Sequence, residues 1–233
     1  MNSTWTQTQE ADLLAIKEED KRRRYLALSQ FLNIVICIPF IPILLVVMVI
    51  IAIAIKLDSP GPVFFVQERV GRYGRRFRMY KFRTYSHTYD PKADQAFMKA
   101  YISGKVNGSD PQATRPLFKP NNHAQITRLG SLLRKTSLDE TPQIINILRG
   151  EMSLIGPRPN IPWEVETYDL WHTERLDVLP GITGLAQVKG RSNLCFDDLV
   201  RYDIHYVRNQ SLVMDFKILW WTILTVLTGQ GAG

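Results

Sequence analysis

The stretch FLNIVICIPFIPILLVVMVIIAIAI, residues 31–55, decides the class of this protein because its 25 residues include no charged side chain. As a straight helix it would be roughly 37 Å long, enough to cross a hydrocarbon core of about 30 Å. It is too long and too far from Met1 for the apolar core of a signal peptide, and no small-residue cleavage site follows it. The sequence therefore predicts a retained membrane segment.

Two prolines, Pro39 and Pro42, interrupt this segment. Each removes a backbone hydrogen bond and clashes with the preceding turn, so only residues 43–55, roughly 20 Å of helix, follow the second proline. Cations flank both ends, at residues 21–24 and at Lys56, and positive charge favours the cytoplasmic side. A helix that enters the membrane, breaks and returns satisfies this pattern better than a spanning helix. Spanning helices also tolerate proline, so both topologies remain open here.

Composition narrows the class further. With 233 residues, one sizeable core and at most two domains are expected. The 29 basic and 22 acidic residues give a net charge of +7, which indicates an anionic partner such as membrane lipid, nucleic acid or nucleotide, and a hydrophobic fraction of 45% excludes a wholly disordered chain. Two distant cysteines, Cys37 and Cys195, exclude a disulfide scaffold and a cysteine-based zinc site, so a reducing compartment is expected.

A basic region follows the membrane segment. The turn SPGP at 59–62 leads into an expected strand over 63–66, and residues 69–83 then hold seven cations and no acid. Apolar and basic residues alternate over 77–84, as in a strand with one face toward an anion. A solvated face or a rim for lipid headgroups explains this pattern equally well. Nucleic acid is less favoured because the basic region comes directly after a membrane segment.

The remaining sequence predicts a mixed architecture. Residues 86–122 form a polar insertion with one expected helix over 94–102. Apolar spacing predicts helices over 126–135, from about Asp139 to Gly150, and over 161–178. Residues 212–227 combine tryptophans and aliphatic residues with Asp215 and Lys217, which suits a helix lying at a membrane interface.

Asp139 and Glu140 are the strongest candidates for chemistry. At a helix N-terminus the free N–H groups and the helix dipole keep a carboxylate ionised, so Asp139 could attack phosphorus or hold Mg²⁺. The structural alternative is a capping box formed by Ser137 and Glu140, or Asp139 as the N-cap, and the spacing alone favours capping. The basic neighbours Arg134 and Arg158 shift the balance toward a site for a metal-bound pyrophosphate.

Five motifs then occur in a fixed order: SPGPVFF (59–65), YKFRT (80–84), RKTSLDE (134–140), MSLIGPRP (152–159) and PGITGLAQV (180–188). Together they resemble the bacterial sugar transferase family, the monotopic phosphoglycosyl transferases that initiate capsule, exopolysaccharide, O-antigen or glycoprotein glycan synthesis. The resemblance covers about residues 26–227. Each motif alone is weak, but five in order behind a proline-interrupted apolar segment are specific.

The resemblance implies a reaction and an architecture. A sugar 1-phosphate passes from a UDP-sugar to polyprenyl (undecaprenyl) phosphate, with release of UMP and with Mg²⁺ as cofactor. The implied fold is α+β, with a polar lead-in (1–25), a proline-broken re-entrant membrane helix (26–57) and a mixed α/β catalytic domain (58–233) that ends in an interfacial helix (212–228). Such proteins are monotopic on the cytoplasmic face of the bacterial inner membrane. They contact anionic lipid, do not act on nucleic acid and are compatible with homo-oligomers.

The resemblance also implies roles for individual residues. Asp139 matches the nucleophile, which forms a covalent phosphosugar intermediate and contacts the metal, and Glu140 matches the second carboxylate of the dyad. The implied substrate-binding residues are Lys81, Arg83, Arg134, Arg158, Gln187 and Arg191. Each of these residues also has a non-catalytic interpretation. Lys81 and Arg83 could contact lipid headgroups, and Arg134 could be an exposed charge on a helix. Arg158 could form a structural salt bridge, and Gln187 could support a turn. Asp203 and Tyr206 match a late motif for which core support is favoured.

Two departures from the family pattern are Tyr85, where methionine is usual, and Thr141, where leucine is usual; neither removes a reactive group. Two other functions stay open from the residues alone. One is a basic membrane-peripheral binding protein in which Asp139 and Glu140 are only helix caps. The other is a metal-dependent phosphohydrolase that acts on polyprenyl diphosphates.

Overall fold

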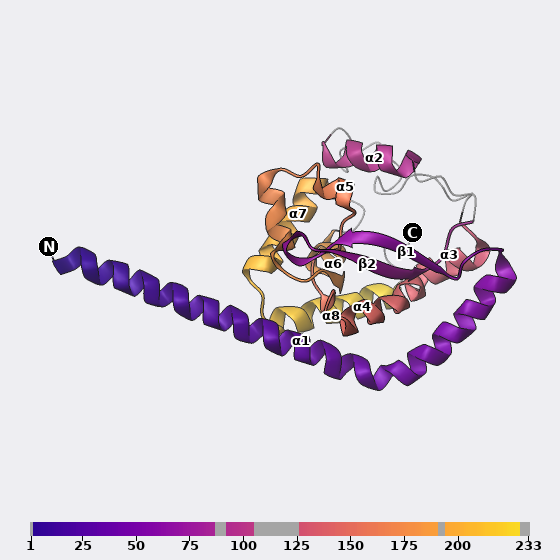
Figure 1. Cartoon of the computed structure of the whole chain (residues 1–233), viewed down its shortest axis with the longest axis horizontal. Coiled ribbons are helices and arrows are strands. Elements are labelled where there is room, and N and C mark those ends of the chain that lie inside the picture. The colour runs from indigo at the N-terminus through magenta and orange to yellow at the C-terminus, as the bar shows by residue number, and fades with distance from the viewer. Residues whose placement is uncertain (1, 87–91, 105–125, 191–193, 229–233) are drawn as a thin grey trace.

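Helix α1 (Asn2–Asp58) is the first element of the computed structural model, which describes residues 2–86, 92–104, 126–190 and 194–228. The predicted lead-in (1–25) and the predicted membrane helix (26–57) therefore form one continuous helix. Pro39 and Pro42 lie inside it without ending it. Figure 1 shows α1 bent part-way along its length, and interior prolines are a usual cause of such bends because each removes a helical hydrogen bond.

One stripe of α1 packs against the rest of the protein. Asn33, Cys37, Ile51 and Ile55 are buried, and their spacing follows the helical period. The Asn33 amide donates to the Ser153 hydroxyl at 2.9 Å. The other side of the helix is apolar and exposed, and only 11% of the most apolar stretch of the helix is buried against the rest of the protein. The helix is therefore attached to the domain along one side and presents apolar side chains on the other.

An antiparallel hairpin follows α1. Strand β1 (Phe64–Val70) pairs with strand β2 (Arg76–Phe82), and the 3-10 turn η1 (Arg72–Gly74) connects them. Strand β1 is longer than the expected 63–66, because pairing with β2 extends it to Val70. Phe77 and Met79 are buried while Arg78 between them is exposed, so the alternation expected over 77–84 is confirmed at 77–79 but does not continue to 84, where Arg83 and Thr84 are both buried.

The segment after β2 returns to that strand, because the 3-10 helix that carries Asp139 and Glu140 packs against β2. Helix α2 (Lys92–Ile102) lies in the predicted insertion, of which residues 87–91 and 105–122 fall outside the described ranges. Helix α3 (Arg128–Lys135) is capped by the Thr127 hydroxyl, and the 3-10 helix η3 (Leu138–Gln143) and helix α4 (Ile144–Leu148) follow. A Cβ on Gly130 would lie 2.2 Å from the Thr84 carbonyl oxygen. Only glycine there lets α3 pack this closely against the end of β2.

A second, parallel pair of strands supports the other side of the site. Strand β3 (Ser153–Ile155) pairs with β4 (Gly181–Thr183), and a Cβ on Gly181 would lie 2.1 Å from the Gly156 nitrogen. Between these strands the single helix expected over 161–178 is wrong. The structure has the short helix α5 (Pro162–Val165) and the 3-10 helix η4 (Leu170–Asp177). The break occurs because extended Asp169 starts a new cap, in which its backbone N–H donates to the His172 Nδ1 at 3.1 Å.

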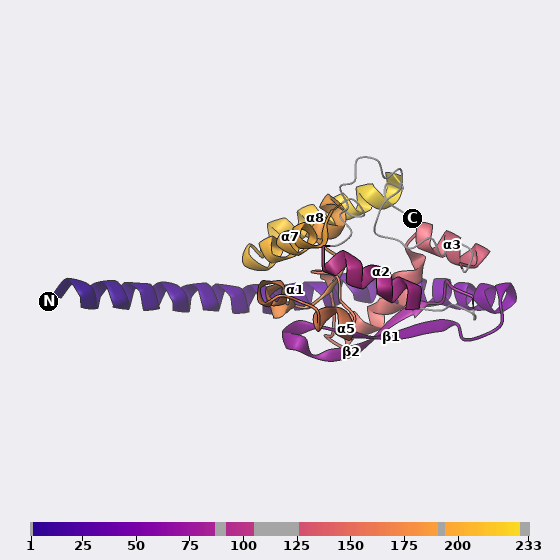
Figure 2. The ribbon, with the colours of Figure 1, turned by 90° about the horizontal axis from the view of Figure 1, so that it is seen from above.

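Three helices complete the chain: α6 (Leu185–Lys189), α7 (Phe196–Arg208) and α8 (Leu212–Thr228). Seen from above in Figure 2, α7 and α8 lie on one side of α1 and the hairpin lies on the other. Asp203 forms a buried ion pair with Arg175. The Tyr206 hydroxyl donates to Asp215 at 2.9 Å. Core support, the role favoured for Asp203 and Tyr206, is therefore confirmed.

Candidate active site

An ion pair between Lys81 of β2 and Glu140 links the hairpin to the carboxylate dyad. The Lys81 Nζ donates to the Glu140 Oε1 at 2.6 Å, and the two side chains are only 15% and 21% exposed. The capping-box alternative is wrong, because Ser137 makes no side-chain cap bond and the Glu140 carboxylate turns to Lys81 instead. Ser137 has a φ of 57°, a left-handed conformation uncommon for a residue other than glycine. A strained residue at this position points to a functional constraint on the turn before Asp139.

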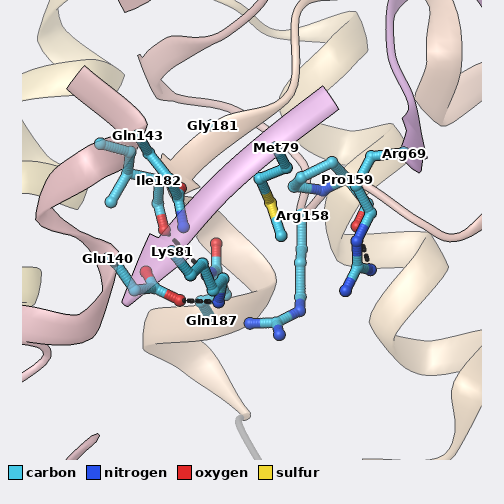
Figure 3. A pocket seen from close by; sticks show the side chains of 10 residues that line it. All are labelled: Arg69, Met79, Lys81, Glu140, Gln143, Arg158, Pro159, Gly181, Ile182 and Gln187. Carbon is cyan, nitrogen blue, oxygen red and sulfur yellow. Dashed lines mark hydrogen bonds and ion pairs between the residues drawn. The ribbon is translucent and has the colours of Figure 1, made fainter. Parts of the chain in front are cut away.

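A small cavity opens beside this ion pair. Its lining comes from β1, β2, η3, the Pro157–Pro159 turn, β4 and α6, and consists of Arg69, Met79, Lys81, Glu140, Gln143, Arg158, Pro159, Gly181, Ile182 and Gln187. Figure 3 shows the Arg158 side chain extending from its loop toward the side of the cavity that holds Gln187 and Lys81. Three of the lining residues are cations and one is an acid. The cavity is therefore electropositive and suits an anion with several phosphate oxygens.

Arg158 contributes to the charge of the cavity without a direct ion pair to any residue that the structure describes, although its charge lowers the pKa of Glu140. Its side chain is exposed, and within the described part of the chain it forms no ion pair. The structural salt bridge considered for it is therefore wrong. Proline on both sides restricts the backbone of its turn, so its guanidinium is held near the cavity without being tied to a partner. Such an arrangement leaves all of its donors available for a ligand.

Arg69 is a site residue that sequence reasoning missed. Its guanidinium is buried in the cavity wall, where Nη1 donates to the Pro159 carbonyl at 2.9 Å and Nη2 to the Gln67 side chain at 2.6 Å. Burial and the nearby Arg158 lower the pKa of Arg69 to about 10, which keeps it charged at neutral pH. In the sequence it is one of seven cations between residues 69 and 83, and no local pattern separates it from the others.

Asp139 lies beside the cavity and is half-buried, although it is not among the lining residues. Burial raises the pKa of Asp139, while Lys81 and Arg134 act in the opposite direction and Glu140 adds to the increase. For Glu140, burial alone would raise the pKa, but the charges of Lys81 and Arg158 outweigh it and the pKa is lowered. Within the dyad, the ion-paired Glu140 therefore stays ionised to a lower pH than usual, whereas Asp139 takes up a proton at a higher pH than usual.

Arg134 is held by Tyr85, and its charge acts on Asp139. Its Nη1 donates to the Tyr85 hydroxyl at 3.3 Å, and its guanidinium lies 5.2 Å from the centroid of the Tyr85 ring. Arg134 is partly buried, so the exposed helix charge considered for it is wrong. Tyr85, which departs from the usual family pattern, thus orients an arginine whose charge favours the ionised form of Asp139.

Of the other predicted substrate-binding residues, one lines the cavity, one does not, and one lies outside the described residues. The guanidinium of Arg83 is buried and donates to the Ser59 and Pro60 carbonyls at 2.8 and 2.7 Å, so it fastens the turn after α1 and does not line the cavity. Gln187 donates to the Ile182 carbonyl at 3.1 Å and also lines the cavity. Arg191 lies outside the described residues.

The donor set at the dyad fits a magnesium ion shared with a substrate. The described residues hold no cluster of three or more histidine, cysteine, aspartate or glutamate side chains that could form a complete cage. Mg²⁺ commonly binds through one or two carboxylates together with substrate phosphates and water. Asp139 offers one such carboxylate beside an electropositive cavity, whereas Glu140 is already committed to Lys81.

A family model described as "Bacterial sugar transferase" matches residues 24–229. This chain belongs to the bacterial sugar transferase family. The match begins before the apolar segment, so it includes α1 from residue 24 onward, both strand pairs and α8. The family resemblance expected from the five motifs is confirmed.

Characterised relatives support the same assignment. The chain is 38% identical over 209 residues to the galactosyl transferase CpsE of Streptococcus agalactiae, covering 89% of this chain and 44% of that protein. It is 38% identical over 178 residues to the exopolysaccharide production protein ExoY of Sinorhizobium fredii, covering 76% of each. It is 36% identical over 214 residues to the UDP-N-acetylgalactosamine-undecaprenyl-phosphate N-acetylgalactosaminephosphotransferase of Aeromonas hydrophila, covering 89% of this chain and 45% of that protein. The chain thus spans a little less than half of CpsE and of the Aeromonas protein.

Proposed function

We propose that this protein transfers a sugar 1-phosphate from a UDP-sugar to undecaprenyl phosphate, as the initiating step of an exopolysaccharide, capsule or related glycan. Family membership and the names of its relatives support the substrate classes. The observation that carries the proposal is the meeting of Lys81, Glu140, Arg69 and Arg158 around one cavity beside Asp139. Three cations suit a pyrophosphate, and a neighbouring carboxylate suits attack on it.

In the proposed reaction an Asp139 carboxylate oxygen attacks the phosphorus that carries the sugar. The bond from that phosphorus to the bridging oxygen breaks, and UMP leaves with the electron pair. An oxygen of undecaprenyl phosphate then attacks the same phosphorus, which gives the diphosphate-linked sugar and frees Asp139. Arg158 and Arg69 lie where they can hold the phosphate oxygens, and Arg134 favours the ionised nucleophile. Asp139 would hold Mg²⁺, which neutralises pyrophosphate charge when bound.

UMP release tests this function. Purified protein with undecaprenyl phosphate, Mg²⁺ and a panel of UDP-sugars should release UMP with at least one donor, and sustained turnover should require the lipid acceptor. Release of inorganic phosphate from polyprenyl diphosphate without any nucleotide sugar would favour the phosphohydrolase alternative. Salt-sensitive binding to anionic vesicles without UMP from any donor would favour the binding-protein alternative.

We also propose that α1 is embedded in the membrane from one side and does not span it. Its buried stripe contacts the domain from Asn33 to Ile55, a length of roughly 33 Å. A spanning helix would carry one end of this stripe across the bilayer and away from the domain to which it is packed. The exposed apolar side of α1 would then face lipid, and the domain would lie on the cytoplasmic face.

Cysteine labelling in intact cells checks this topology. Glu19 and Asp58 are exposed and flank the apolar segment, so each can be changed to Cys in a Cys37→Ser/Cys195→Ser background. Both sites should be protected from an impermeant maleimide until the membrane is permeabilised. Labelling of one site from outside and of the other only after permeabilisation would establish a spanning helix. Retained UMP release by the background variant controls for folding.

Arg69→Met should raise the KM for the UDP-sugar about tenfold with a smaller fall in kcat, because the variant loses a cavity charge and loosens the loop that carries Arg158. Arg69→Lys keeps the charge but loses the planar guanidinium and its several N–H donors, so its KM should lie between those of Arg69→Met and wild type. Arg75→Gln, at an exposed position on the same hairpin, is the matched control. An unchanged KM in Arg69→Met would remove Arg69 from the donor site.

A further inference from the structure

A second and larger cavity lies between α6, α7 and α8. It is an open groove of about 840 Å³, whose apolar walls include Val213, Met214 and Trp221. No residue that lines it also lines the catalytic cavity. Helix α6 separates the two, because Gln187 faces the catalytic cavity while Lys189 of the same helix faces the groove. This volume is in the range of sites that hold small molecules or lipid portions.

The charges of the groove are unbalanced. Its acid, Asp198, is paired with Arg201 at 3.5 Å. Lys189 and Lys217 are exposed, and in the described part of the chain neither has a carboxylate partner. The Lys189 ammonium lies 4.0 Å from the centroid of the Trp221 ring, which holds it at the groove wall. The groove thus offers two free positive charges beside apolar surface.

The groove is continuous with the exposed apolar face of α8. Val213 belongs to both, and the face continues along the helix through Phe216, Trp220 and Ile223, all exposed. This spacing places them on one side of the helix, as in a helix lying in a membrane interface. A ligand in the groove could therefore keep its charged end at the lysines while its apolar part follows the surface that faces lipid.

We propose that this groove binds an anionic glycerophospholipid of the membrane, with its phosphate at Lys189 and Lys217 and its acyl chains on the apolar walls. The groove shares no lining residue with the cavity beside Asp139, so the occupant need not be a substrate. Two cations near a lipid surface each add favourable binding energy toward anionic headgroups. The inference rests on the proposed membrane association but not on the proposed chemistry.

Native mass spectrometry of the purified full-length chain tests this site. After incubation with equal amounts of phosphatidylglycerol and phosphatidylcholine of matched acyl chains, the wild type should retain phosphatidylglycerol preferentially. The double variant Lys189→Gln/Lys217→Gln should lose that preference by about tenfold or more. Lys189→Arg/Lys217→Arg should keep it, as should Arg75→Gln, which removes an exposed cation elsewhere. Asp139→Asn should also keep it, which separates this test from any failure of the proposed reaction.

Three outcomes would overturn the proposal. One is equal retention of the two lipids by the wild type, and another is an undiminished preference in the Lys→Gln double variant. The third is displacement of phosphatidylglycerol by equimolar undecaprenyl phosphate that depends on the same two lysines, because the groove would then be an acceptor site. Retention of bound phosphatidylglycerol in the presence of equimolar undecaprenyl phosphate supports a structural lipid.

Discussion

Asp139→Asn is expected to lower sugar-phosphate transfer by on the order of 10⁴-fold, while the protein still reaches the membrane and binds its donor. The amide keeps the size of the side chain and removes the carboxylate oxygen that is proposed to attack phosphorus. The charges of Lys81 and Arg134 favour the ionised carboxylate but only partly offset the burial that raises its pKa, and Asn has no such charge for them to interact with. UMP release under saturating donor and acceptor measures the loss.

The covalent step has its own readout. Wild-type protein given UDP-sugar without acceptor and quenched in acid should gain the mass of one phosphosugar, and Asp139→Asn should not. Asp58→Asn, at an exposed acid at the end of α1, should retain both turnover and the mass increase. Wild-type rates in Asp139→Asn would exclude this residue as the nucleophile. An adduct that persists in that variant would move the covalent step to another side chain.

Arg175→Met is expected to lower the free energy of unfolding by roughly 3–5 kcal/mol, the largest stability effect anticipated in this chain. Arg175 and Asp203 form an ion pair whose side chains are 1% and 2% exposed. Removing the arginine leaves a buried carboxylate without its partner, in addition to losing the 3.0 Å hydrogen bond from Arg175 to the Tyr168 hydroxyl. Urea titration in detergent, followed by tryptophan fluorescence, measures the change.

A double-mutant cycle separates burial from pairing. Asp203→Leu alone should destabilise the protein to a similar degree, whereas Arg175→Met/Asp203→Leu should recover most of the loss, because no charge is then left buried alone. Arg208→Met, which removes an exposed pair with Glu174, should leave the urea midpoint nearly unchanged. Strictly additive losses in the Arg175→Met/Asp203→Leu variant would show that the two side chains do not stabilise the fold as a pair.

Local patterns in the sequence were reliable where short-range physics dominates. The apolar run over 31–55 lies within a helix, residues 77–82 of the alternation expected over 77–84 lie in β2, and Gly150 adopts a φ of 70° just after α4. The helix expected over 161–178 failed because a cap at Asp169 restarts the chain, and the pattern of apolar residues did not reveal it. Helix α7 contributes three buried residues to a core cluster that it shares with the end of α2, and the sequence pattern did not predict this helix.

The candidate site was predictable only in part. Lys81, Arg134, Arg158 and the dyad follow from motifs, since these residues stand in recognisable strings. The roles of Arg69 and Arg83 did not, because both are arginines in the same basic stretch and only the fold turns one toward the cavity and the other toward the turn after α1. Likewise, Ser137 and Glu140 matched a capping box in spacing, yet Lys81, distant in sequence, captured the carboxylate.

The sequence by itself determined the apolar entry segment, the family, the carboxylate dyad and the excess of positive charge, because each depends on residue type and local spacing. Tertiary structure decided which cations meet at the cavity, which side of α1 is buried against the domain, and where the groove beside α8 lies. These features depend on contacts between residues far apart in the chain. The close approaches of Gly130 to Thr84 and of Gly181 to Gly156 are examples of such contacts, and they exist only once the chain has folded.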